Sequence, residues 1–196
     1  MFSSFLKPFY HIIFFLFIFI LFITLFFIPF MSNEDLLVGL EGKEIVISDF
    51  GFVWPIPGYN TITSPFGKRV SPTAGASNFH KGIDIGAPEG TVLIAAVDGT
   101  ITFAGFLGGG GYTITLSKDN LKITYCHVSP NFLVEVGQEV LRGQIIAQVG
   151  PKYVYGVPGN TYHDANGNPT NGATTGCHLH FGVRENEKYV NPLNYY

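Results

Sequence analysis

Residues 53–196 alternate between short apolar runs and turns that contain glycine or proline, and this pattern constrains the fold more than any other feature of the sequence. Six of the runs are rich in β-branched and aromatic residues, as strands usually are. They are residues 92–97, 100–104, 112–116, 121–126, 145–149 and 178–183. No long stretch after residue 52 has the 3.6-residue period of an amphipathic helix. The pattern therefore predicts an all-β domain, a compact antiparallel β-sandwich or barrel-like fold.

The glycine run at residues 108–111 lies between two of the predicted strands. A phosphate-binding loop would end in Lys-Ser or Lys-Thr and would lead into a helix. This run has neither feature, so we predict a hairpin connection.

The N-terminal segment has a different composition, with 11 of the 19 phenylalanines in the first 31 residues. Residues 12–30 carry no charge, and a helix of that length spans ~28 Å, close to the thickness of a bilayer's hydrocarbon core. One alternative is a cleaved signal peptide, whose apolar region is usually shorter and ends at a small-x-small site. Another is a buried core helix, which normally has a polar face. We expect an uncleaved transmembrane anchor at residues 9–31.

Charges on either side of this segment indicate its orientation. Lys7 precedes the span, whereas Glu34 and Asp35 follow it, so the positive-inside tendency places residues 1–8 in the cytoplasm. Residues 32–52 predict a charged stalk with a short strand at 44–47. The net charge of −3 offers no concentrated basic face, which excludes a nucleic-acid partner. We therefore expect a single-pass protein of the cell membrane with residues 53–196 outside.

A histidine and an aspartate lie four residues apart in the segment His-Lys-Gly-Ile-Asp at 80–84. In a straight strand their Cα atoms would be ~13 Å apart. His80 and Asp84 can therefore bind one metal ion only if the chain bends between them, and Gly82 permits such a bend.

Two further segments place histidines on predicted strands. His178 and His180 are two residues apart and so project from one face of a strand, and His127, in Tyr125-Cys126-His127, is another strand-borne histidine. One such histidine alone is usually structural, but the set together predicts a metal site. Zinc accepts histidine nitrogen and carboxylate oxygen, and a catalytic zinc site keeps three protein ligands and one open position. Three of these groups can bind the metal, which leaves two histidines for proton transfer.

These segments resemble the lysostaphin-type (LytM-type) zinc metallopeptidases, bacterial endopeptidases of the cell wall that carry a His-x-x-x-Asp and a His-x-His motif. The resemblance covers residues 54–196. Supporting matches are Ser64-Pro65-Phe66-Gly67 with Arg69, residues 80–88, Asp98-Gly99-Thr100, Gly143-Gln144 and Asn191-Pro192. The resemblance implies that His80, Asp84 and His180 bind one Zn²⁺ ion and that His127 and His178 are catalytic. It also implies that the substrate is a peptide of peptidoglycan.

The segment before the His-x-His motif departs from the family pattern. Here 27 residues separate Gly150 from His178, where the family usually has a handful. Loops of this length are usually functional or disordered. We expect the insertion at 153–171 to form a wall of the substrate groove. Its His163 and Asp164 are expected to be solvated, with an additional metal ligand as the alternative.

Two cysteines each precede a site histidine. Because successive side chains of a strand alternate between its faces, Cys126 and Cys177 are expected to point away from the metal as free, buried thiols. A disulfide outside the cell is the alternative. Tyr125 shares a face with His127 and either assists catalysis or packs in the core.

Two other functions agree with parts of the sequence. A membrane-anchored scaffold or activator of cell-wall machinery would keep the fold and lose activity, although this chain retains all five site residues. A lipoyl- or biotinyl-type carrier shares the glycine-containing turns. Such a carrier needs a lysine at an exposed hairpin tip and would leave the histidines without a role.

Overall fold

The computed structural model describes residues 41–196, apart from residues 44 and 46. The predicted anchor at 9–31 lies outside the described residues, as do most of the stalk and half of the predicted strand at 44–47. Among the described residues, no helix is long and apolar enough to span a membrane. The strands are β1 (Ile62–Ser64), β2 (Gly67–Lys68), β3 (Phe79–His80), β4 (Ile83–Gly86), β5 (Val92–Ile94), β6 (Gly99–Phe106), β7 (Tyr112–Lys118), β8 (Leu121–Cys126), β9 (Glu139–Val140), β10 (Ile145–Gln148), β11 (His178–Glu185) and β12 (Lys188–Val190). Two 3₁₀ helices are η1 (Gly108–Gly110) and η2 (Pro192–Tyr195).

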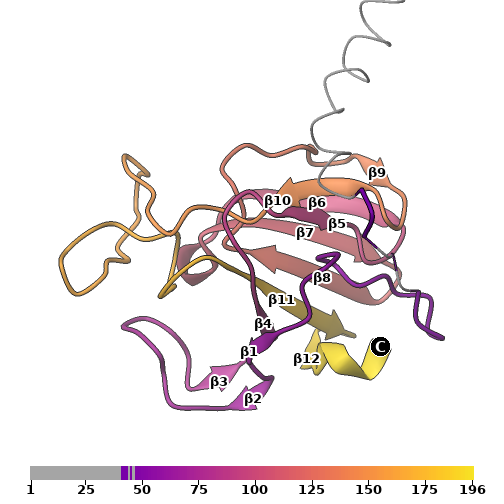
Figure 1. Cartoon of the computed structure of the whole chain (residues 1–196), viewed down its shortest axis with the longest axis horizontal. Helices are drawn as coiled ribbons and strands as arrows, with labels where there is room; N and C mark the ends of the chain where they lie inside the picture. Colours follow the sequence, from indigo (N-terminus) through magenta and orange to yellow (C-terminus); the bar gives the residue numbers. More distant parts are fainter. Residues whose placement is uncertain (1–40, 44, 46) are drawn as a thin grey trace, which may run out of the picture. The chain divides into compact units, whose positions relative to one another are not determined.

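One large antiparallel sheet carries most of the strands, in the order β1-β4-β11-β8-β7-β6-β9 (Figure 1). Within this sheet, β11 also pairs with β12 beyond the end of β4. Two small antiparallel sheets, β10-β5 and β2-β3, complete the arrangement. The expected all-β, antiparallel fold is confirmed.

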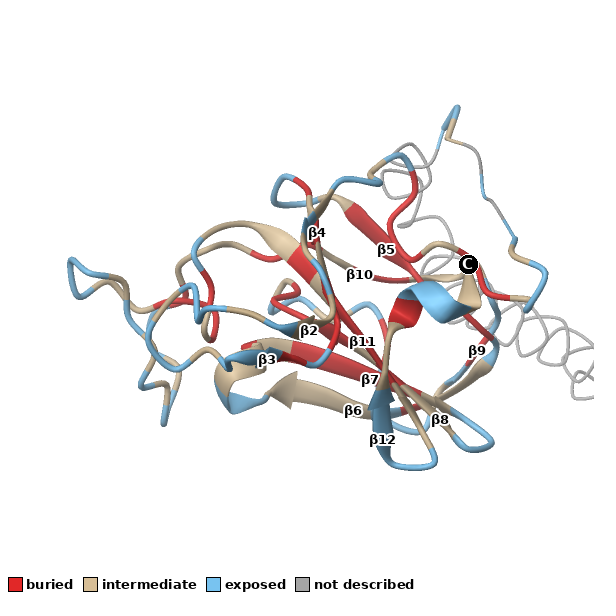
Figure 2. Cartoon of the chain, turned by 90° about the horizontal axis from the view of Figure 1, so that it is seen from below, coloured by how far each residue is buried: buried red, intermediate tan, exposed pale blue. Residues whose placement is uncertain are grey.

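The hydrophobic core joins the large sheet to the β10-β5 pair. Apolar side chains from both contribute to one buried cluster, and buried positions gather on β5, β7 and β11 (Figure 2). Phe52, which we assigned to the stalk, is 3% exposed and belongs to the same cluster. Tyr125 is fully buried in the cluster and accepts a hydrogen bond from the Ala96 amide, so its role is packing.

All six predicted strands are present, the one at 121–126 with the predicted ends and the other five with shifted ends, and the glycine run at 108–111 connects β6 to β7 as predicted. The remaining six strands were not predicted. Most of them have only two or three residues, too few to show a two-residue period. They form because longer neighbours supply hydrogen-bond partners, as β11 does for β4 and β12.

Register between β4 and β11 brings the two metal-binding motifs together. Asp84 pairs with His180, and Gly86 pairs with His178. Gly82 lies in the break between β3 and β4, where a Cβ atom would come 2.4 Å from the Phe181 carbonyl oxygen. Glycine is therefore required at position 82 by this close approach between chain segments.

Candidate metal centre and active site

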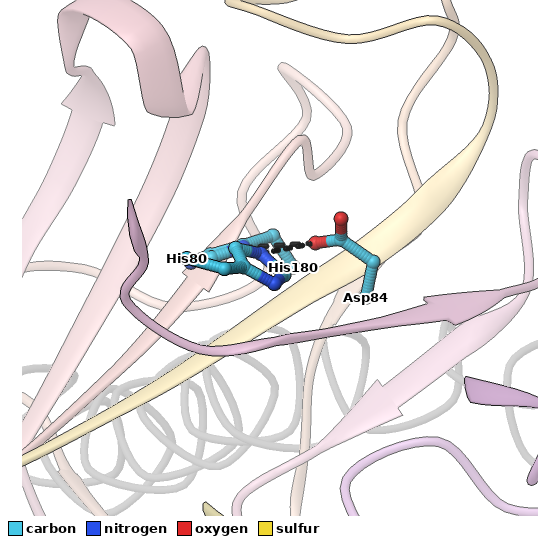
Figure 3. A group of neighbouring side chains, drawn as sticks. All are labelled: His80, Asp84 and His180. Carbon is cyan, nitrogen blue, oxygen red and sulfur yellow. Dashed lines mark hydrogen bonds and ion pairs between the residues drawn. The ribbon is translucent and has the colours of Figure 1, made fainter. Parts of the chain in front are cut away.

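The side chains of His80 at the end of β3, Asp84 of β4 and His180 of β11 converge at one point (Figure 3). His80 Nε2 lies 3.0 Å from Asp84 Oδ1 and 2.9 Å from His180 Nδ1. His180 Nδ1 is also 2.9 Å from Asp84 Oδ1. The three atoms thus form a nearly equilateral triangle.

The donor set fits zinc. Bonds of ~2.0–2.1 Å in a tetrahedron place neighbouring donor atoms ~3.3 Å apart, close to the separations observed here. Two imidazoles and one carboxylate leave one tetrahedral position open. His80, Asp84 and His180 are therefore the residues that could hold the ion.

Side chains behind the triangle orient its members. The His80 Nδ1–H donates to the Pro65 carbonyl oxygen at 2.8 Å, which leaves Nε2 unprotonated toward the centre. Arg69 Nη1 donates to Asp84 Oδ2 at 3.1 Å and to Ser64 Oγ at 2.6 Å. Arg69, which Ser64 helps to position, therefore holds the carboxylate oxygen that does not face the histidines.

Electrostatics keep these groups in the form that binds a metal. Burial raises the pKa of Asp84, but its contacts with His178, His180 and His80 outweigh burial and hold the pKa well below its usual range. Burial lowers the pKa of His180, against the opposing effect of Asp84. An ionised carboxylate and a neutral imidazole are the forms that coordinate zinc.

The two histidines outside the triangle lie beside it. His178 Nε2 is 3.5 Å from Asp84 Oδ1, and the His127 and His178 rings are 4.7 Å apart between centroids. His178 Nδ1–H donates to the Gly176 carbonyl at 2.9 Å, and His127 Nδ1–H donates to the Asn171 carbonyl at 2.7 Å. In the neutral form of each ring Nε2 is therefore the nitrogen without a proton, and it can accept one.

The sequence placed His127 on a strand, but β8 ends one residue earlier at Cys126. His127 has a φ of 58°, in the left-handed region that is uncommon for residues other than glycine. Its backbone is fixed on both sides, since its N–H donates to the Gly110 carbonyl and its carbonyl accepts from the Gly150 amide. Such conformations persist where the surrounding structure enforces them, and they cluster at functional sites. Burial, together with the nearby His178, lowers the pKa of His127 to about 3.

Asn171 is a site residue that the sequence did not reveal. It is fully buried, and besides accepting from His127 it bridges the flanking backbone. Its Oδ1 accepts from the Tyr112 amide at 2.8 Å, and its Nδ2 donates to the Val128 carbonyl at 3.0 Å. A Cβ atom at Gly111 would lie 2.3 Å from Asn171 Oδ1. The glycine run was the available signal, since it makes room for this side chain.

A groove of about 800 Å³ surrounds the five residues. The expected wall from residues 153–171 is not found there, because the groove is lined by residues 173–177, which follow the insertion. The insertion contributes indirectly through Tyr162. A Cβ atom at Gly75 would meet this ring at 2.6 Å, and one at Gly109 would meet its hydroxyl at 3.3 Å. Tyr162 thus fastens the insertion to two loops that line the groove.

Other residues of the insertion lie away from the metal centre. His163 is exposed, as expected. Asp164 is not simply solvated, because it accepts hydrogen bonds from the Tyr153 hydroxyl and from the amides of Asn166 and Asn168. It organises the turn of the insertion.

Both cysteines are free, and Cys126 is buried whereas Cys177 is half-buried. The prediction that they point away from the site is wrong, since both line the groove. Cys126 lies opposite His180 in the sheet and so shares its face. The left-handed backbone of His127 then breaks the alternation, which allows adjacent residues to reach the same groove.

Fold and site together define a class: an antiparallel all-β protein with a candidate metal site of two histidines and one carboxylate in the lining of a groove. The sequence profile of peptidase family M23 matches residues 78–192. The chain belongs to peptidase family M23, which confirms the resemblance to the lysostaphin-type metallopeptidases.

Relatives within the family have different named roles. The chain is 34% identical over 137 residues to the DD-carboxypeptidase/endopeptidase Mpg of Neisseria meningitidis, covering 69% of this chain and 27% of that protein. It is also 34% identical over 130 residues to the murein hydrolase activator NlpD of Escherichia coli, covering 65% and 29%. The chain thus spans about a quarter of the length of these relatives.

Among solved structures, the chain is similar to a zinc-containing peptidase from Vibrio cholerae. The TM-score is 0.55 at 26% sequence identity, and the match covers 74% of this chain and 44% of that one.

Proposed function

We propose that this protein is a zinc-dependent endopeptidase that hydrolyses peptide bonds in the cross-links or stem peptides of peptidoglycan. One observation carries the proposal: three donor atoms converge within 3.0 Å in the lining of a groove, beside two histidines that each offer Nε2. Similarity to an endopeptidase and to a murein hydrolase activator supports the substrate class.

The residues of the groove have separable roles in such a reaction. When bound, zinc supplies a Lewis acid that polarises the scissile carbonyl and makes water more acidic. His127 and His178 present unprotonated Nε2 atoms next to the ligand triangle, so either can accept the proton of the attacking water. Arg69 keeps Asp84 oriented, and Asn171 keeps His127 oriented.

The proposal includes the expected cellular arrangement. Residues 1–8 lie in the cytoplasm, residues 9–31 anchor the chain in the cell membrane, and residues 32–52 carry the domain at 53–196 to the peptidoglycan outside. The charge asymmetry around the apolar segment supports this orientation. Protease added to intact, wall-stripped cells should remove the domain, whereas a fully protected domain would contradict the arrangement.

The alternative is a membrane-anchored activator or scaffold with little activity of its own, and the similarity to NlpD favours it. The complete set of His80, Asp84 and His180 favours an enzyme.

The two proposals are separated by measuring zinc and cleavage on the same sample. Full-length protein purified in detergent should contain about one zinc per chain and should release new peptides from purified peptidoglycan, detected by mass spectrometry. Chelation should abolish the release. Zinc-loaded protein that releases nothing, but stimulates a separate cell-wall hydrolase, would favour the activator.

A further inference from the structure

The groove continues past the ligand triangle along β11. Alternate residues of a strand share a face, and His178, His180, Gly182 and Arg184 of β11 all line the groove. Gly182 has no side chain, and a Cβ atom there would lie 3.3 Å from the Lys81 carbonyl oxygen and 3.7 Å from His180 Nε2. Arg184 follows His180 by four positions, a Cα separation of ~13 Å in a strand. One arm of the groove therefore leads from the metal centre to a guanidinium group.

A second cation, the ammonium group of Lys81, also lines this arm of the groove. Tyr189 of β12 pairs with Arg184 in the sheet, and the Arg184 guanidinium lies 5.4 Å from the centroid of its ring. Lys81 Nζ lies 5.0 Å from the centroid of the same ring. Lys81, Arg184 and Tyr189 all line the groove. One aromatic ring is thus in cation–π contact with both Lys81 and Arg184.

The positive charge of this arm is incompletely balanced by the protein. Asp84 is the acidic residue among those that line the groove, and it already binds Arg69. Glu187 lies outside the groove lining and accepts from Arg184 Nη1 at 3.3 Å. Within the described part of the chain, Arg184 Nε is buried and has no hydrogen-bond partner. The buried Nε atom is out of reach of a ligand, whereas the positive charges of Lys81 and Arg184 together exceed the charge of Glu187 beside them, and this excess favours an anionic group in the groove.

We propose that Lys81 and Arg184 form a subsite for a carboxylate group of the peptide substrate. An extended peptide advances ~3.3 Å per residue, so the carboxylate lies about three or four residue lengths from the bond that is cut. This proposal rests on the proposed function and narrows it: the preferred substrates are stem peptides that carry free carboxylates, in preference to uncharged glycine bridges.

The test uses two cross-linked stem-peptide dimers that differ only in whether their free carboxylates are amidated. Full-length wild type should cleave the carboxylate form with a kcat/KM about ten- to a hundredfold higher, as a charge-assisted hydrogen bond implies. Arg184→Met should remove most of this preference, and Lys81→Met, at an exposed position, should reduce it. Lys122→Met is the matched control, because Lys122 pairs with Glu187 beside Arg184 but does not line the groove.

A binding measurement separates this proposal from the proposed function. Affinities of both dimers for the His178→Ala variant, measured by calorimetry, should show the same preference without turnover. If the preference in binding is present but neither dimer is cleaved by wild type, the subsite stands and the endopeptidase proposal fails. If wild type cleaves both dimers equally, or if Arg184→Met and Lys81→Met keep the wild-type preference, the subsite is refuted and the endopeptidase proposal stands.

Discussion

The backbone carbonyl of Asn171 accepts the Nδ1–H of His127 at 2.7 Å, across 44 positions of sequence. This bond fixes the tautomer and the orientation of a proposed catalytic histidine. The Asn171 side chain meanwhile accepts from the amide of Tyr112 and donates to the carbonyl of Val128, so three atoms of Asn171 bind His127, its neighbour Val128 and the first residue of β7.

Asn171→Ala is therefore expected to reduce kcat while zinc content stays near wild type. The substitution leaves two buried backbone groups without partners, at a cost of ~1–3 kcal/mol each in the free energy of unfolding. Asn160→Ala is the control, because it removes two side-chain hydrogen bonds in the same loop, one to the Thr170 carbonyl and one from the Tyr162 amide. Unchanged kcat in Asn171→Ala would show that His127 does not depend on this residue.

The ligand triangle and the two adjacent histidines should respond differently to substitution. His180→Ala removes one of three donors, so zinc should be lost or weakly held. His178→Ala and His127→Ala should keep zinc but lower kcat by ~10²–10⁴-fold, the usual loss when acid–base assistance is removed. Zinc content and kcat are measured on the same samples, with the exposed His163→Ala as control. Zinc loss in His178→Ala combined with retention in His180→Ala would reverse the assigned roles.

Acid should destabilise the metal-free protein partly through His127. Its pKa is about 3 in the folded protein, against 6.5 for an unperturbed histidine, so between these values the folded state binds fewer protons than the unfolded state. Neutral His127 therefore contributes stability that is complete above pH 6.5 and is lost as the pH falls toward 3. In the presence of a chelator, wild type should lose stability as the pH falls from about 6.5 to about 4 more steeply than His127→Gln, by up to ~1.4 kcal/mol per pH unit. Parallel pH profiles for the two proteins would contradict this prediction.

Substitution of Tyr162 should weaken substrate binding and leave the zinc content unchanged. Its ring lies against Gly75 and its hydroxyl lies near Gly109, and both glycines line the groove. Tyr162→Ala should release these loops and raise KM, with zinc content unchanged. Tyr155→Ala, in the same insertion at a side chain that is 70% exposed, should have no effect. If Tyr162→Ala has wild-type KM on every peptidoglycan fragment, the insertion is passive.

The two thiols should differ in reactivity. Burial raises the pKa of the Cys126 thiol to about 12, so at pH 8 roughly one molecule in 10⁴ carries the reactive thiolate. Cys177 is half-buried at the groove. A disulfide-exchange reagent should modify one thiol quickly in native protein and both after denaturation. The rapid phase should disappear in Cys177→Ser, and two rapid thiols in native wild type would refute the prediction.

Local sequence was sufficient for the fold class and for the residue types of the site. A strand pattern is visible within runs of five or more residues, which is why each of the six predicted runs contains a strand, whereas β2, β3 and β9, with two residues each, were not predicted. The pairing of His178 with His180 on one face also follows from the two-residue period of a strand. The His-x-x-x-Asp motif indicated His80 and Asp84 as two further candidates, but the sequence did not show that the chain bends to place them side by side.

Tertiary structure decided what these residues can do together. His80 and His180 are 100 positions apart, and they meet because β11 pairs with β4 in one register, which no local pattern specifies. The left-handed backbone of His127 depends on contacts with distant segments, and it brings His127 to the same groove as Cys126, against the alternation of a strand. The sequence by itself therefore determined the all-β fold class and a set of candidate metal ligands. Only long-range packing decided the sheet register, the hydrogen bonds of Asn171 to His127, Tyr112 and Val128, and the cationic arm of the groove at Arg184, because each depends on groups far away in the chain.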